Sequence, residues 1–215
     1  MKVIDLSHDI CETMPVFPGT AAPRLDEAYT IGRNGFAEKM LHLVSHTGTH
    51  IDAPAHILPG AATLDRLEIG HFMGPGCVLD VSRAVGRKIE VADLEKKAAR
   101  ISVADFVLFH SGWARHWGDA AYFGPYPVLS AAAASWLAGF KLKGVGVDAV
   151  SMDEADSISL TVHRTLLGKN MVIIENLTGL EALIDRDFTF SCLPLKIQAG
   201  DGSPVRAVAI IDSTK

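Results

Sequence analysis

The chain has 215 residues, of which 48% are hydrophobic and 21% charged, an ordinary globular composition that is long enough to bury a sizeable core. The net charge is −5, the pI is about 6.0 and no basic stripe occurs, so the sequence does not indicate a nucleic-acid partner. A membrane span would need about 18 consecutive apolar residues, which are absent, and the first residues are too polar for a signal peptide. The three cysteines include no C-x-x-C pair, so we expect no disulfide framework and a cytoplasmic location.

The pattern of apolar, glycine and proline residues along the chain predicts a mixed α/β fold with many strands and few helices. Prolines and a Pro-Gly turn predict an irregular loop over residues 11–24, and residues 45–56 are expected to form a loop or a broken strand. Because no linker, repeat or low-complexity segment divides the sequence, residues 1–215 are expected to form a single domain. Strands are expected over residues 3–6, 36–44, 76–81, 106–109, 144–147, 171–174, 188–197 and 205–211, the last two joined by a turn at 200–202, and helices over 91–99, 131–140 (capped by Ser130) and 160–167.

The segment 46–56, HTGTHIDAPAH, concentrates three imidazoles and one carboxylate within a short stretch. His50 and Asp52 are two residues apart, so in an extended segment their side chains point to one face. Gly48 lets the backbone bend and bring His46 round to the same place. Imidazoles together with a carboxylate are typical ligands of first-row divalent metals, and the two oxygens of Asp52 can bridge two ions. His56 is expected to stand beside the metals without ligating them.

A single histidine in a loop is usually a surface residue or a hydrogen-bonded one, and this interpretation suffices for His8, His42, His71, His110 and His116. The density of the 46–56 cluster makes a purely structural explanation much weaker there.

A catalytic metal site also needs ligands from a second part of the fold. Glu175 ends an apolar run, where an unpaired buried carboxylate would be destabilising and a metal would satisfy it. His163 lies in the helix predicted over 160–167. Taken alone, Glu175 would be interpreted as a solvent-facing strand end and His163 as a helix-surface residue, so both gain weight only beside the first cluster.

Other catalytic motifs do not fit. The glycines of residues 144–149 open a predicted strand instead of following one, which excludes a dinucleotide-binding fingerprint. There is no P-loop and no G-x-S-x-G elbow, and Ser111 has no sequence context that would make it a nucleophile. Cys77 and Cys192 have apolar surroundings typical of core residues.

The segment HTGTHIDAPAH resembles the H-x-G-T-H-x-D-x-P-x-H signature of the cyclase family of metal-dependent hydrolases, which includes kynurenine formamidases and isatin hydrolases, and every fixed position is met. The resemblance covers nearly the whole chain. It extends to DLSHDI…MPVFPGT near the N-terminus, HSGW at 110–113, VHRTLLGKNMVIIENL at 162–177 and LKIQAGDGSPVRAVAI at 195–210. The implied fold is α/β, the swivelling β/β/α domain of this family, assembled as a homodimer or homotetramer.

The resemblance also implies roles for individual residues. His46 and His50 would ligate a first divalent metal, His163 a second, and Asp52 and Glu175 would bridge, with zinc or manganese as the metal and one or two ions bound. His56 would be the general acid/base. Phe17 corresponds to an aromatic residue that lines the substrate pocket of the formamidases. In those enzymes the aromatic residue is followed by Pro-Gly-Asp, whereas this chain has Thr20 in place of the carboxylate.

The implied function is hydrolysis of a small amide or lactam, in the first place that of N-formylkynurenine to kynurenine and formate, an arylformamidase reaction. Three alternatives remain open at the level of sequence: hydrolysis of isatin or another cyclic amide, a metal-dependent isomerase or dehydratase, and a non-catalytic metal-binding protein of the same fold. An intact His56 argues against the last, because a structural metal site needs no free base.

Overall fold

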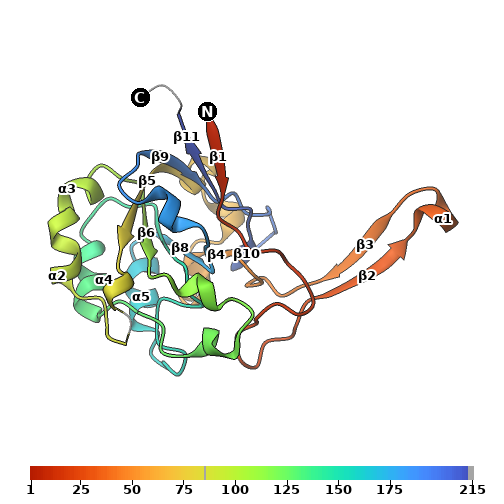
Figure 1. The fold of residues 1–215 in the computed structure, drawn as a ribbon, viewed down its shortest axis with the longest axis horizontal. Coiled ribbons are helices and arrows are strands. Elements are labelled where there is room, and N and C mark those ends of the chain that lie inside the picture. Colours follow the sequence, from red (N-terminus) through yellow and green to blue (C-terminus); the bar gives the residue numbers. More distant parts are fainter. Residues whose placement is uncertain (85, 213–215) are drawn as a thin grey trace.

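A computed structural model describes residues 1–84 and 86–212, which form a nine-stranded mixed sheet and a separate two-stranded hairpin (Figure 1). The sheet has the strand order β1-β11-β9-β5-β6-β7-β8-β4-β10. Its strands are β1 (Lys2–Asp5), β4 (His50–Asp52), β5 (Met73–Asp80), β6 (Phe106–His110), β7 (Gly144–Val147), β8 (Val172–Glu175), β9 (Phe188–Ser191), β10 (Gly202–Pro204) and β11 (Val208–Ile211).

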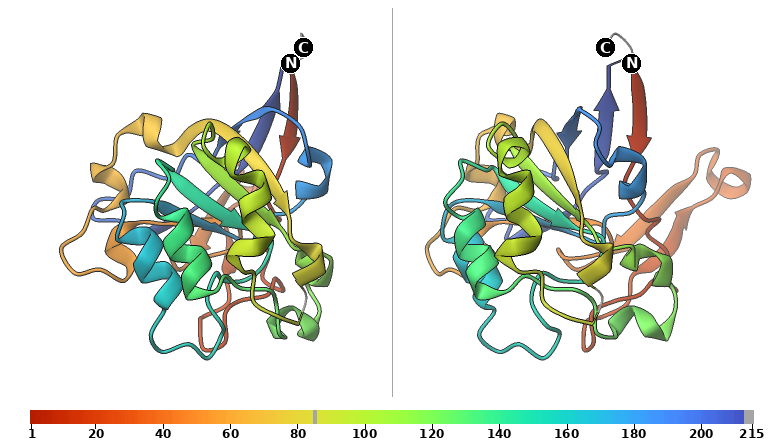
Figure 2. Two further views of the ribbon diagram at one scale, coloured as in Figure 1. Left: turned by 90° about the vertical axis from the view of Figure 1, so that its left-hand side faces the viewer. Right: turned by 60° about the vertical axis from the view of Figure 1, so that its left-hand side comes forward.

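The centre of the sheet consists of the parallel strands β5, β6, β7 and β8, and antiparallel strands extend it on both sides. Strands β6, β7 and β8 are buried almost throughout, which matches the short uninterrupted apolar runs that predicted them. The helices α2 (Val91–Leu94), α3 (Ala98–Ile101), α4 (Ala131–Leu137) and α5 (Thr161–Leu167) gather on one face of the sheet (Figures 1 and 2).

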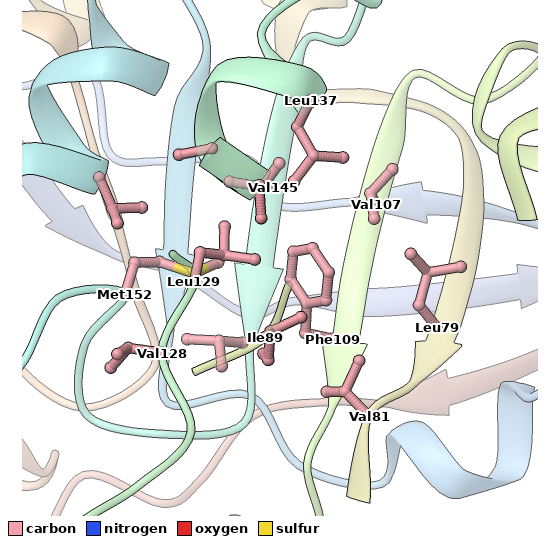
Figure 3. Close-up of a cluster of buried hydrophobic side chains, with 14 of the residues drawn as sticks. Leu79, Val81, Ile89, Val107, Phe109, Val128, Leu129, Leu137, Val145 and Met152 are labelled. Atoms are coloured by element: carbon pink, nitrogen blue, oxygen red, sulfur yellow. The ribbon is translucent and has the colours of Figure 1, made fainter. Parts of the chain in front are cut away.

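Two apolar clusters hold the layers together. The first lies between the sheet and the helices and includes Val107, Phe109, Leu137 and Val145 (Figure 3). The second fills the opposite face of the curled sheet and brings Ile51 of β4 against core residues of β6 and β9. Because Ile51 is fully buried, the residues on either side of it, His50 and Asp52, are fixed on the other face of the strand.

The hairpin formed by β2 (Arg24–Tyr29) and β3 (Glu38–His42) projects from this body, with the short helix α1 (Ile31–Asn34) at its tip (Figures 1 and 2). Every residue of β3 is exposed. The apolar side chains exposed along the hairpin and its tip are Tyr29, Ile31, Phe36, Met40 and Leu41.

The predicted mixed α/β fold is confirmed, and each predicted strand overlaps an observed one. Ser130 caps α4 as expected, its hydroxyl accepting a hydrogen bond from the backbone N–H of Ala133. No helix within the described ranges is long and apolar enough to cross a membrane.

Four predictions on secondary structure were wrong in detail. The strand expected over 188–197 ends at Ser191, and Pro194, which has no N–H to donate, follows shortly after it. The helix expected over 91–99 is broken into short turns. Strand β10 stands where a simple turn between the last two strands was expected, and it pairs with β4 instead. Strand β2 was missed because its residues are charged and exposed, without the alternation of a half-buried strand.

Candidate metal centre and its cavity

Strand β4 carries the centre of the predicted donor cluster. It is buried along its whole length and lies between β8 and β10, with His50 directly opposite Glu175. Nε2 of His50 is 3.3 Å from Oδ1 of Asp52 and 3.5 Å from Oε2 of Glu175. The extended spacing thus puts His50 and Asp52 on one face as predicted, and the register of β4 on β8 adds Glu175.

His163 joins these residues from the first turns of α5. It is 2% exposed, so it is a core residue and not the helix-surface residue that its local sequence would suggest. Its Nε2 is 3.3 Å from Oε1 of Glu175 and 3.6 Å from Oδ2 of Asp52. Each carboxylate therefore directs one oxygen towards His50 and the other towards His163, an arrangement suited to bridging.

His46 and His56 lie on the more open side of Asp52. Nδ1 of His46 is 2.6 Å from Oδ1 of Asp52, and the rings of His46 and His56 lie with their centroids 4.1 Å apart. His56 belongs to the 3-10 turn Pro54–His56 that follows β4, and its side chain is 30% exposed. It is near the donor cluster as predicted, but its ring nitrogen is also close enough to His46 and Asp52 to join them in holding an ion.

Three imidazoles of the cluster are held from outside by a hydrogen-bond acceptor. Nδ1 of His50 donates to the carbonyl of Gly48 at 2.8 Å, and Nδ1 of His163 donates to Oδ2 of Asp153 at 2.7 Å. Nε2 of His46 lies 3.0 Å from Oδ2 of Asp201. In each case the other ring nitrogen faces the carboxylates of the cluster, which is how histidines that bind metals are usually oriented.

Sequence reasoning missed these outer residues. Asp153 accepts hydrogen bonds from the backbone N–H groups of Val162 and His163, so one carboxylate caps α5 and also orients the histidine. Its position outside the helix gave no local capping signal. Asp201 was predicted only as part of a turn, and its approach to His46 depends on the pairing of β10 with β4.

Asn176 was missed as well, although it directly follows Glu175. Its side-chain amide donates to the carbonyl of Gly48 at 2.8 Å and accepts a hydrogen bond from the hydroxyl of Tyr122 at 2.6 Å. Its φ of 58° lies in the left-handed region, which asparagine tolerates better than most residues. Asn176 thereby supports the same carbonyl that orients His50.

The electrostatics of the cluster are those of mutually compensating charges. Burial disfavours the charged form of His46, but hydrogen bonds to Asp52 and Asp201 and the charges of these two groups outweigh burial and raise its pKa to about 9. The same competition raises the pKa of His163, whose partners are Asp153, Asp52 and Glu175. Burial works against ionisation of Asp52, yet hydrogen bonds from three histidines hold its pKa below the ordinary value.

His56 differs from the other histidines of the site. Burial, assisted by the nearby His46 and His163, lowers its pKa, although Asp52 and Glu175 act in the opposite direction. A neutral imidazole at pH 7 can exchange a proton with a bound molecule. Its environment therefore suits a general acid/base better than that of His46.

The donor set fits a divalent metal ion. Ligand atoms of His50, Asp52 and Glu175 lie within 4.8 Å of one another, as do those of His46, Asp52 and His56, and Asp52 belongs to both groups. The first group is entirely buried, where two carboxylates side by side are strongly unfavourable without a compensating positive charge. A dication coordinated by imidazole and carboxylate would supply that charge.

A cavity of about 680 Å³ opens onto the donor residues and is large enough for a small aromatic molecule. Phe17 lies in its wall with 41% of its surface exposed, and Thr20, whose N–H donates to the carbonyl of Phe17, lines the same cavity. The remaining wall is formed mainly by small and apolar residues, including Pro15, Val16, Val44, Val150 and Leu160, with Ser151, Glu154 and Ser157 as polar members.

Comparison with known proteins gives consistent results. A family model described as "Putative cyclase" matches residues 4–154. The kynurenine formamidase of Salinibacter ruber is 33% identical over 218 residues, which cover 97% of this chain and 97% of that protein. Isatin hydrolase A from Ralstonia solanacearum superposes with a TM-score of 0.87 and 26% identity, covering 98% and 92% of the two chains. A structure described as a potential metal-dependent hydrolase with cyclase activity superposes with a TM-score of 0.78 and 28% identity, covering 97% and 96%.

Proposed function

This chain belongs to the cyclase family, and we propose that it is a metal-dependent amidohydrolase that cleaves a C–N bond other than a peptide bond. The first candidate reaction is hydrolysis of N-formylkynurenine to kynurenine and formate, the reaction implied by the name of its relatives. The observation that carries the proposal is the buried cluster of His50, Asp52 and Glu175 at the foot of a cavity of about 680 Å³. A non-catalytic metal site needs neither a substrate-sized cavity nor a neutral imidazole such as that of His56, so these two features argue against a non-catalytic role.

We assign His46, His50 and His163 as metal ligands, with Asp52 and Glu175 as bridging carboxylates. Zinc and manganese both suit this donor set, and with two carboxylates that can each face two histidines it could hold one ion or two. When bound, such an ion lowers the pKa of a coordinated water and polarises the substrate carbonyl. The outer acceptors Gly48 and Asp153 hold His50 and His163 with Nε2 turned towards the carboxylates.

His56 is assigned as the general acid/base. Hydrolysis of a formamide joins water to the carbonyl carbon, breaks the C–N bond and requires a proton on the departing amine nitrogen. His56 is 30% exposed and lines the cavity, so its imidazole can deliver that proton to a bound substrate. Its lowered pKa keeps the ring neutral at pH 7, so it can first accept a proton from the attacking water and then deliver that proton to the departing nitrogen.

An isatin-like lactam or another cyclic amide is the second candidate substrate. The observation in its favour is Thr20, which lines the cavity close to Phe17 at a position where formamidases carry a carboxylate. The structural similarity to an isatin hydrolase supports the same alternative. Both candidate reactions would use the same donor residues, so the fit of the substrate to the wall of the cavity would decide between them.

We further propose that the chain works as a homo-oligomer, a dimer or a tetramer, in the cytoplasm. The hairpin β2–β3 exposes Tyr29, Met40 and Leu41 on a two-stranded ribbon, and a ribbon of this kind cannot cover its own apolar side chains. Packing against a second copy would cover them. The proposed location follows from the sequence, whose three cysteines include no C-x-x-C pair.

The decisive experiment is hydrolysis of N-formylkynurenine by protein of known metal content, beside a sample treated with a chelator. Metal-dependent release of kynurenine would support the formamidase assignment. Absence of turnover on this substrate, together with metal-dependent ring opening of isatin, would replace it by the second candidate. If neither compound is hydrolysed by protein with a filled metal site, both substrate assignments fail.

A further inference from the structure

Asp201 is the one acidic residue of the C-terminal turn, and its side chain reaches the donor cluster from the outside. Its Oδ2 is 3.0 Å from Nε2 of His46 and 3.7 Å from Nδ1 of His56. The side chain is 48% exposed, so the contact with His46 is not forced by burial of the carboxylate. The position of the backbone has to explain it.

The backbone at Asp201 is tied to the strand that carries the proposed ligands. Its carbonyl accepts a hydrogen bond from the N–H of Ala53 at 2.8 Å, and the next residue, Gly202, is paired with Asp52 in the β4–β10 ladder. The turn is therefore held in register with Asp52. This pairing fixes the Cα of Asp201, and with it the origin of the Asp201 side chain, relative to the proposed metal ligands.

Gly202 shows how closely this turn follows His46. A Cβ atom at this position would lie 2.4 Å from Cε1 of His46 and 2.7 Å from its Nε2. Only glycine leaves space for the imidazole to lie against the backbone here. Asp201 and Gly202 thus contact the ring of His46 in two ways. The missing Cβ of Gly202 leaves space for the ring, and the carboxylate of Asp201 accepts a hydrogen bond from its outer nitrogen.

The hydrogen bond at Nε2 determines which nitrogen of His46 faces the cluster. A neutral imidazole carries a single N–H, and the nitrogen without it is the one that can ligate. In this structure Nδ1 lies 2.6 Å from Oδ1 of Asp52 and Nε2 lies 3.0 Å from Oδ2 of Asp201, so each nitrogen has a carboxylate to which it can donate. A metal bound at Nδ1 would displace the hydrogen there, while the hydrogen on Nε2 would stay on Asp201 and keep the ring in the Nδ1-ligating form. His50 and His163 are oriented in the opposite sense, through Nδ1, by Gly48 and Asp153.

We propose that Asp201 is a positioning residue that selects the Nδ1-ligating form of His46 and so sets the affinity of the site for its divalent metal. The inference rests on the proposed role of His46 as a ligand. Asp201 itself touches neither substrate nor reacting atoms in this proposal; it acts through the ring of His46. Loss of such an outer partner weakens metal binding by about 10- to 100-fold in other metalloproteins.

The test is a measurement of metal affinity that needs no substrate. The full-length protein, stripped of metal, would be titrated with Zn²⁺ in competition with a chromophoric chelator, for the parent and for Asp201→Ala, Asp201→Asn and Asp65→Ala. Asp65 is the matched control, because its Oδ1 accepts a hydrogen bond from the N–H of Ala199 and so supports the same turn without reaching His46. Thermal unfolding of each metal-free variant would establish that it is folded.

We expect Asp201→Ala to weaken Zn²⁺ binding by about 10- to 100-fold. Asp201→Asn should recover much of the loss, because the amide oxygen still accepts from Nε2–H, and Asp65→Ala should stay within about twofold of the parent. Equal affinity of Asp201→Ala and the parent would overturn the proposal. An equal loss of affinity in Asp65→Ala would also overturn it, because the cause would then be the conformation of the turn and not the hydrogen bond to His46.

The outcomes also separate this inference from the proposed function. A parent protein that binds no Zn²⁺ or Mn²⁺ would refute both together. A parent that binds metal but hydrolyses neither candidate substrate would refute the substrate assignment alone, and the comparison of the Asp201 variants would still decide the role of this residue. If Asp201→Ala kept the parent's affinity and lost only turnover, its contact with His56 would be the one that matters and the proposal would be wrong.

Discussion

The hairpin β2–β3 and strand β4 follow one another in the chain, yet they bury and expose opposite kinds of side chain. Strand β4 buries polar side chains, His50 and Asp52, and each of them is satisfied by several partners within the same molecule. The hairpin exposes apolar side chains such as Met40 and Leu41, and the described residues of the same molecule do not cover them. Carboxylates and imidazoles gathered in one buried cluster indicate a functional site, whereas exposed apolar groups indicate a surface that needs another molecule.

The largest effect on metal binding and activity is expected from removing Asp52, the carboxylate that three histidines of the buried cluster share. Asp52→Ala leaves His46, His50 and His163 without their shared carboxylate, so bound metal and activity should be lost together, with kcat falling by about 10⁴-fold. Metal content of the purified variant, measured together with turnover, checks this. A variant that retains its full metal content would refute the bridging role of Asp52.

A smaller and more selective effect is expected at the edge of the same cluster. His56→Ala should lower kcat by about 10²- to 10⁴-fold, because the proton donor for the leaving nitrogen is removed. The metal content should remain that of the parent, which distinguishes a general acid/base from a ligand. Loss of metal from this variant would instead place His56 with His46 and Asp52 as a ligand group.

Substitutions in the hairpin should change the oligomeric state and leave metal binding unchanged. Replacing Met40 and Leu41 together by glutamate should shift the protein towards the monomer in light scattering while its metal content stays unchanged, because the hairpin is separate from the buried donors. Val103→Glu is the control, since Val103 is also an exposed apolar residue, 76% exposed, on another part of the surface. An unchanged molar mass in the hairpin variant would remove the hairpin from the proposed interface.

The smallest effect concerns His8, in the segment between β1 and the hairpin. Burial lowers the pKa of His8 to about 4, against the opposing charges of Asp9 and Asp148. The unfolded chain binds a proton at this residue near pH 6.5 and the folded protein does so only near pH 4, so acidification through this window lowers the free energy of unfolding. Because the ring is partly exposed, we expect about 1 kcal/mol between pH 7.5 and 5.0, roughly half of the full effect.

Urea unfolding at these two pH values, for the parent and for His8→Phe, measures this contribution. Phenylalanine retains an aromatic ring against Trp117, on which His8 is stacked at 3.9 Å, but it cannot bind a proton. The parent should lose more stability on acidification than the variant does. Identical pH dependence in the two proteins would contradict the role assigned to His8.

Much of the site could be predicted because its first half is local. The donors His46, His50, Asp52 and His56 lie close together in the chain, and the spacing of His50 and Asp52 already places them on one face of an extended strand. The buried parallel strands were predictable for a similar reason, because a strand covered on both faces is apolar throughout.

The partners of that cluster were decided by the tertiary structure. The register of β4 on β8 sets Glu175 opposite His50, and the packing of α5 brings His163 to the same point. Their local sequence fits a solvent-facing residue equally well, so spacing alone could not place them. Resemblance to a family suggested that Glu175 and His163 are metal ligands, and the fold gives the distances between these residues and the donors of β4.

The sequence by itself determined the chemistry of the donor segment, the α/β class and the positions of the buried strands along the chain, because each of these depends on the spacing of residues along the backbone. Only the tertiary structure decided that Asp153 and Asp201 hold the outer nitrogens of His163 and His46, and that β2–β3 projects with its apolar side chains uncovered. The physical reason is that hydrogen bonds between distant segments and the burial of a side chain depend on which elements pack together, a property of the whole fold and not of any local pattern.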